Sequence, residues 1–138
     1  GSPNGSRGEP LQSSMMAEAL LCRQHLGWHQ YDPWLTKEVA ALLVDHPLDW
    51  NQRDSHYLFY ATQVMYHMSG AGWSRWNEKL RKMLLDTQVK SGKEIGSWDP
   101  EGDAFGRSSG RLYTTCMSIY MLEVYYRHSP IYSAVGQD

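Results

Sequence analysis

The 138-residue chain lacks a strong excess of charge of either sign. Thirteen lysines and arginines stand against 15 aspartates and glutamates, which gives a formal net charge of −2. Domains that bind nucleic acid normally present a clustered basic surface, and an anionic membrane surface also attracts basic clusters. The composition therefore argues against nucleic acid as a partner.

Long apolar runs and ligand-spaced cysteines are also missing. No stretch of 18 apolar residues occurs, so we expect no membrane-spanning helix in this segment. Cys22 and Cys116 are the two cysteines, and neither has the C-x-x-C or Cys/His spacing of a metal site. We interpret both as core thiols, which suit a reducing and an oxidising compartment equally well. Localisation therefore stays open.

The start of the chain has little that could form a core. Residues 1–10 are rich in Gly, Ser and Pro, the opening Gly1-Ser2 is typical of a protease-cleavage scar, and no apolar stretch of a signal peptide is present. We expect residues 1–10 to be a disordered tag or linker. A single domain is expected over residues 11–132, followed by a tail at 133–138.

Helical periodicity dominates the expected domain. The start and stop signals predict five main helices, at about 13–26, 33–46, 55–68, 73–89 and 111–128. Asp32 and Pro33 are a typical N-cap and first helical residue, and Asp54 or Ser55 can cap the third helix. Residues 90–110 contain five glycines and predict one long loop. The sequence thus indicates an all-α fold.

Apolar residues are distributed differently among these helices. The third and fifth have apolar or tyrosine side chains on nearly every face, which indicates burial, whereas the fourth has a charged stripe and is expected to lie outside. Residues 60–65 and 113–118 are also similar to one another, 53 positions apart. Alternating inner and outer helices with such a period predict stacked helical hairpins.

A glutamine near the end of the fourth helix, Gln88, is followed by Gly96-Ser97-Trp98. This pattern resembles the Gln-Trp motif of squalene-hopene cyclases and their relatives, and residues 60–63, 72–77 and 122–126 extend the resemblance over roughly residues 15–132. The resemblance implies antiparallel helical hairpins of α/α-toroid type, here a partial toroid of about five to six helices. It also implies that Gln88 and Trp98 tie a helix end to the next turn.

The residues that the family's enzymes use are not found. Triterpene cyclases protonate their substrate with an Asp-x-Asp-Asp cluster, and protein prenyltransferases hold zinc with an Asp, a Cys and a His; neither set occurs here. We therefore assign no catalytic residue and no cofactor, and we expect neither squalene nor a prenyl diphosphate to be turned over. The expected function is a scaffold or protein-binding module, part of a larger protein, whose partner is another protein, the rest of its own chain or a second copy.

Two alternative functions remain open at this point. A domain derived from terpenoid cyclases would bind an apolar isoprenoid in a pocket lined by Tyr60, His67 and Tyr113, although a histidine on an apolar helix face is more typically a core residue. A carbohydrate-processing domain would need an exposed Trp98 beside Asp99 and Asp103.

Asp99, Glu101 and Asp103 form an alternating acidic cluster whose oxygens are weak candidates for a hard cation such as calcium. Gly110 occupies the place where an EF-hand loop would carry its bidentate glutamate. The competing interpretation is a solvated loop in which Asp99 forms an Asx-turn onto Glu101.

Overall fold

A computed structural model describes residues 10–127, and the side chains of residues 12–126. Within these residues the fold is all-helical, with five α-helices and one short 3-10 helix: α1 (Pro10–His25), α2 (Pro33–Asp45), η1 (Trp50–Gln52), α3 (Ser55–Met68), α4 (Gly70–Thr87) and α5 (Gly106–Arg127). The expected tail and most of the expected linker lie outside the described residues. No described helix is long and apolar enough to cross a membrane.

The caps explain why α2 and α3 begin where the sequence predicts. The Asp32 side chain accepts hydrogen bonds from the backbone N–H groups of Trp34 and Leu35, and that of Asp54 accepts one from Tyr57 N–H at 3.1 Å. An N-cap carboxylate satisfies amides that have no partner within the helix.

The other helices differ from the predicted bounds. α1 already begins at Pro10, since proline is compatible with a first helical turn. α4 begins at Gly70, three residues early, because Ser69 turns the chain with a positive φ of 56°. α5 includes residues 106–110 of the expected loop, with a break at Gly110.

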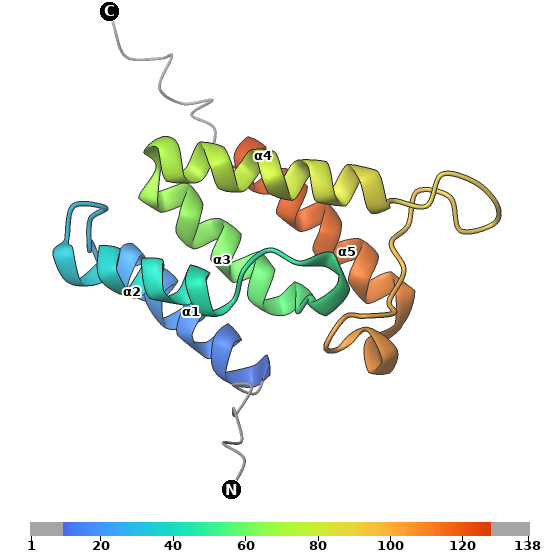
Figure 1. Ribbon diagram of the computed structural model, residues 1–138, viewed down its shortest axis with the longest axis horizontal. Coiled ribbons are helices and arrows are strands. Elements are labelled where there is room, and N and C mark those ends of the chain that lie inside the picture. Colours follow the sequence, from blue (N-terminus) through green and yellow to red (C-terminus); the bar gives the residue numbers. More distant parts are fainter. Residues whose placement is uncertain (1–9, 128–138) are drawn as a thin grey trace, which may run out of the picture.

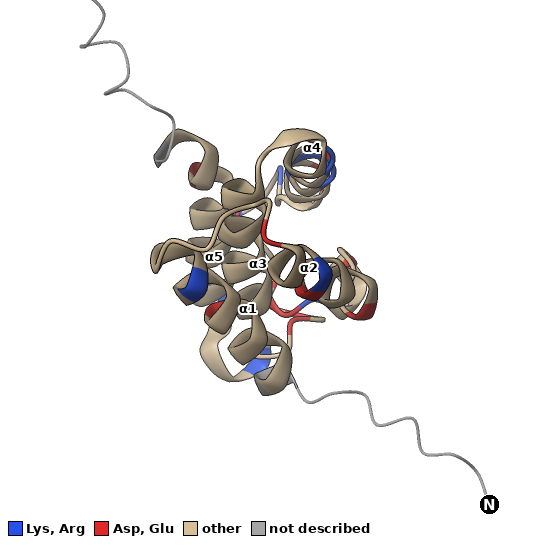
Figure 2. Ribbon diagram, turned by 90° about the vertical axis from the view of Figure 1, so that its left-hand side faces the viewer, with Lys and Arg blue, Asp and Glu red and all other residues tan. Residues whose placement is uncertain are grey.

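Helix α3 is the centre of the fold (Figures 1 and 2) and contacts α1, α4 and α5, while α2 contacts α1. Seen end-on, α2 and α4 lie on one side of α3 and α5 on the other (Figure 2). Half of α3 is buried, seven of its 14 residues, against three of 18 in α4. The prediction that α3 is more buried than α4 is therefore confirmed.

The prediction for α5 needs correction, because this helix is not buried all round. Its buried side chains share one side: Thr114, Ser118, Met121 and Val124. Other large apolar side chains of the same helix are exposed: Leu112, Ile119, Tyr120, Tyr125 and Tyr126. Apolar residues on every face predicted burial, but the main helix partner of α5 is α3, which covers one side.

Candidate functional site

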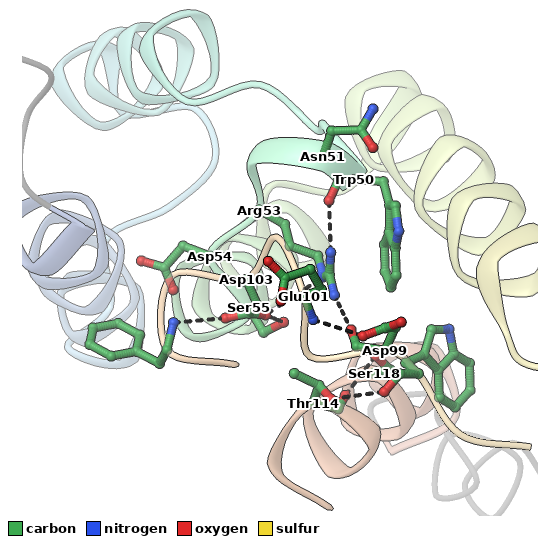
Figure 3. A network of polar contacts seen from close by, with 12 residues as sticks. Trp50, Asn51, Arg53, Asp54, Ser55, Asp99, Glu101, Asp103, Thr114 and Ser118 are labelled. Atoms are coloured by element: carbon green, nitrogen blue, oxygen red, sulfur yellow. Dashed lines mark hydrogen bonds and ion pairs between the residues drawn. The ribbon is translucent and has the colours of Figure 1, made fainter. Parts of the chain in front are cut away.

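The most extensive polar cluster joins the start of α3, the loop after α4 and the start of α5 (Figure 3). At its centre Arg53 Nε lies 3.7 Å from Asp103 Oδ2, and the two side chains are only 2% and 0% exposed. Arg53 Nη1 donates to Trp50 O at 2.9 Å, and Nη2 donates to Asp99 O. The guanidinium carbon lies 3.6 Å from the centre of the Trp50 ring, a cation–π contact.

The backbone holds this pair in register. Arg53 and Asp103 form an isolated parallel β-bridge, in which Ala104 N–H donates to Arg53 O at 2.9 Å. Asp103 also accepts hydrogen bonds from the Ser55 hydroxyl and from Phe105 N–H. The turn then requires Gly106, because a Cβ there would lie 2.0 Å from Pro100 O. Residues 98–106 are thereby fixed to the start of α3.

Trp98 connects the same loop to α4 and α5. Its indole Nε1 donates to Leu84 O at 2.8 Å, and its backbone carbonyl accepts from the Thr114 hydroxyl at 3.0 Å. Its own N–H donates to Thr115 Oγ1 at 3.2 Å. The side chain is 2% exposed. Trp98 therefore does not present the exposed ring that the carbohydrate-processing alternative requires.

Gln88 is also part of this connection. Its Nε2 donates to Gly96 O at 2.9 Å. Val89 and the loop exchange two backbone hydrogen bonds: Val89 N–H to Ser97 O at 2.9 Å, and Gly96 N–H to Val89 O at 2.8 Å. Gly96 has a φ of 85°, a conformation that favours glycine. The end of α4 is thus tied to residues 96–98.

The three acidic residues proposed as weak metal ligands do not converge. Asp99 accepts from Glu101 N–H at 2.9 Å, which is the Asx-turn geometry, while Glu101 pairs with Arg107. Asp103 is buried against Arg53. No cluster of three or more His, Cys, Asp or Glu arranged to hold a metal ion occurs among the described residues.

Burial dominates the electrostatics of the cluster. Desolvation by burial lowers the pKa of Arg53, and this effect exceeds the opposite effect of the nearby Asp103 and Asp99 charges. Burial raises the pKa of Asp54, although its hydrogen bond from Tyr57 N–H acts in the opposite direction. Burial, with smaller contributions from Asp103 and Asp54, raises the pKa of Tyr113 to about 12. The Tyr113 hydroxyl is buried and has no hydrogen-bond partner in the described part of the chain.

The residues of the candidate pocket, Tyr60, His67 and Tyr113, lie in separate surroundings. The Tyr60 ring stands 5.2 Å from that of His56, and burial raises its pKa. The His67 ring stands 5.3 Å from that of His25, at the other end of α3. Tyr113 lies on α5, and its pKa is raised by burial with smaller contributions from Asp103 and Asp54.

His67 instead lines a cavity of about 370 Å3 that the sequence did not reveal. Its walls come from the end of α1, the α1–α2 loop and the α3–α4 junction; they are Gln24, Trp28, His29, Gln30, Tyr31, His67 and Ser69. Neither Tyr60 nor Tyr113 contributes to it. Three dispersed segments form the cavity, so no local motif could have identified it.

Comparison of the chain with protein-family models, with curated proteins and with solved structures gives no match in any of the three.

Proposed function

We propose that this domain is a non-enzymatic helical-repeat module, resembling the squalene-cyclase and prenyltransferase repeat, that binds protein through the exposed side of α5. The observation that carries the proposal is the position of α5 in the fold. It packs on α3 with one side and leaves large apolar side chains on the other. A helix in this position has an unused packing surface.

The exposed side has a regular spacing. Leu112, Ile119 and Tyr126, here called the α5 stripe, are separated by seven residues and are 78%, 40% and 67% exposed. Seven residues are close to two helical turns, so the three side chains follow one line along the helix. Apolar residues at this interval favour packing against a second helix.

We propose that the partner that binds the α5 stripe is a second copy of the chain. The α5 stripe is symmetric about Ile119, so an antiparallel two-fold pairing places Ile119 against its own copy and Leu112 against the partner's Tyr126. Such a pairing is isologous and closes at two subunits. It also sets the two helix dipoles in opposite directions, which is favourable.

The described residues also give indirect support to a non-enzymatic role. The best-buried carboxylate, Asp103, is already engaged by Arg53 and Ser55. A strongly acidic proton donor has to present its proton to a bound substrate, and Asp103 is held inside a closed network instead. The separate surroundings of Tyr60, His67 and Tyr113 favour the scaffold over the isoprenoid alternative, which uses these three residues as one pocket.

Sedimentation velocity tests the proposed pairing. Because a single pair of helices buries less surface than a standard interface, we expect a reversible dimer over about 10 to 300 µM protein. Ile119→Ser should shift the population to monomer. Leu85→Ser on α4 is the matched control, because Leu85 is similarly exposed at 47%, and it should leave the dimer unchanged. A protein that stays monomeric throughout this concentration range would contradict the proposed self-association.

A further inference from the structure

We propose that the cavity beside Trp28 and Tyr31 binds a neutral polyhydroxylated ligand, of the size and chemistry of a mono- or disaccharide. The cavity is separate from the α5 stripe and does not depend on it. Its volume of about 370 Å3 lies within the usual range for small-molecule sites.

The charge of the walls restricts the ligand first. Among the residues that the structure describes, no Lys, Arg, Asp or Glu lines the cavity, and its basic side chains are His29 and His67. The Arg23 guanidinium stacks over Trp34 at 4.2 Å and Trp28 at 5.7 Å and does not line the cavity. An anionic ligand would lose its hydration here without gaining a lysine or arginine partner, and a cationic ligand without gaining a carboxylate. The walls therefore favour a neutral molecule.

The polar groups of the walls then favour hydroxyls. Six of the seven lining side chains carry an amide, an imidazole or a hydroxyl, and all three groups can both donate and accept hydrogen bonds. A sugar hydroxyl has the same double capacity. These side chains therefore match a ligand with many hydroxyls better than one that only donates or only accepts.

Gln24 provides a specific unsatisfied group. Its Nε2 donates to Val64 O at 3.1 Å, which fixes the amide, while its Oε1 is buried without a hydrogen-bond partner in the described part of the chain. A buried acceptor without a donor is unfavourable. Gln24 lines the cavity, and a ligand hydroxyl that donates a hydrogen bond to this oxygen would provide the missing partner.

Two aromatic rings supply an apolar surface next to these polar groups. Trp28 is 40% exposed and Tyr31 is 84% exposed. The Trp28 ring is held edge-to-face against Trp34, with centroids 5.5 Å apart, so its orientation is set before a ligand binds. A ring face beside convergent amides suits a sugar, which has an apolar C–H face and polar edges.

The backbone is strained at one of the residues that line the cavity, Ser69. Ser69 has φ 56° and ψ −165°, a region populated almost entirely by glycine. Its hydroxyl donates to Gln30 Oε1, another wall residue. Strained non-glycine residues cluster at ligand sites, and here the strain fixes Ser69 and Gln30 relative to one another.

The test is an NMR titration of the full 15N-labelled chain with glucose, maltose, cellobiose and diacetylchitobiose, each to about 20 mM. We expect at least one of them to shift the Trp28 indole signal saturably. Tyr31→Ala should weaken that binding about tenfold, and Tyr31→Phe, which keeps the ring, should preserve it. Tyr31 is exposed, so neither substitution should unfold the domain.

Two results would overturn the proposal. One is the absence of a saturable shift with all four sugars. The other is tighter binding of glucose 6-phosphate than of glucose, because the described cavity walls offer a phosphate no lysine or arginine.

Discussion

The indole Nε1 of Trp98 donates a hydrogen bond to the backbone carbonyl of Leu84, 2.8 Å away and 14 residues earlier in the chain. This carbonyl belongs to the last turn of α4, where it also accepts the N–H of the C-cap residue Gln88 at 3.1 Å. The bond joins the end of one helix to the loop that leads into the next. Trp98 therefore stabilises the helix end and the core together.

Truncation of Trp98 should separate these two contributions. Trp98→Ala is expected to lower the free energy of unfolding by about 3 to 5 kcal/mol, as for a large buried aromatic side chain. Trp98→Phe keeps most of the ring but removes the donor, and should cost about 1 to 3 kcal/mol. Chemical denaturation at constant pH measures both. If the parent protein and the two variants have the same free energy of unfolding, Trp98 does not stabilise the core.

The pair formed by Arg53 and Asp103 should behave as a coupled unit. Asp103→Ala leaves a buried guanidinium without its carboxylate, so we expect a loss of about 3 to 5 kcal/mol. Adding Arg53→Met to that variant should recover part of the loss, because the unpaired charge is then gone. A double-mutant cycle measured by urea denaturation gives the coupling. Additive losses would show that the two residues act independently.

An exposed pair between the same loop and the start of α5 is the control for this cycle. Glu101 and Arg107 form an ion pair whose side chains are 64% and 81% exposed. Solvent screens such pairs strongly. Glu101→Gln should therefore leave the unfolding curve unchanged within error.

Tyr113 should make the domain sensitive to alkaline pH. Its folded-state pKa is raised to about 12, above the value of about 10 expected in the unfolded chain. The unfolded state loses this proton first, so the stability due to Tyr113 is fully present below about pH 10 and is lost as the pH rises towards 12. Tyr113→Phe should weaken the alkaline loss.

The same substitution should be harmless at neutral pH. It removes a buried hydroxyl that has no hydrogen-bond partner among the described residues, so stability should be unchanged or higher by about 1 kcal/mol. Tyr31→Phe, at an exposed position, is the control. Thermal melts from pH 7 to 11 provide the comparison, and a Tyr113→Phe protein with the alkaline profile of the parent would contradict the assignment.

Ser69 offers a test of backbone strain. Ser69→Gly should raise the free energy of unfolding by about 1 kcal/mol, because glycine adopts this φ and ψ without strain. Ser69→Ala keeps the strain and loses the hydrogen bond to Gln30, so it should be destabilising. Opposite signs for the two variants in thermal denaturation are the expected result. A destabilising Ser69→Gly would argue against strain at this turn.

The sequence predicted the features that depend on local chemistry. Asp32, Pro33 and Asp54 determine where α2 and α3 begin, and these signals act within one helical turn. Ser69 was not anticipated, because an ordinary serine gives no sign of a positive φ.

Longer-range features could not be predicted in this way. Arg53 and Asp103 are 50 positions apart, and no periodic pattern pairs them. The exposure of α5 was mispredicted for a related reason: an apolar helix has the same sequence whether a neighbour covers it or not. The family resemblance drew attention to Gln88, Gly96 and Trp98, but it gave no indication of the cavity at Trp28.

Disulfide cross-linking across the α5 stripe tests the proposed pairing most directly. In a background with Cys22→Ser and Cys116→Ser, Ile119→Cys places a thiol at the two-fold axis, where mild oxidation should yield a covalent dimer. Leu112→Cys is the matched control. In the antiparallel pairing its two copies are separated by 14 residues along the helix axis, about 21 Å, which is too far for a disulfide.

Non-reducing electrophoresis with mass spectrometry of the linked peptide gives the result. The account predicts efficient dimer formation for Ile119→Cys and only monomer for Leu112→Cys, at equal protein concentration. Equal cross-linking of the two variants, or none with Ile119→Cys, would contradict a symmetric α5 interface.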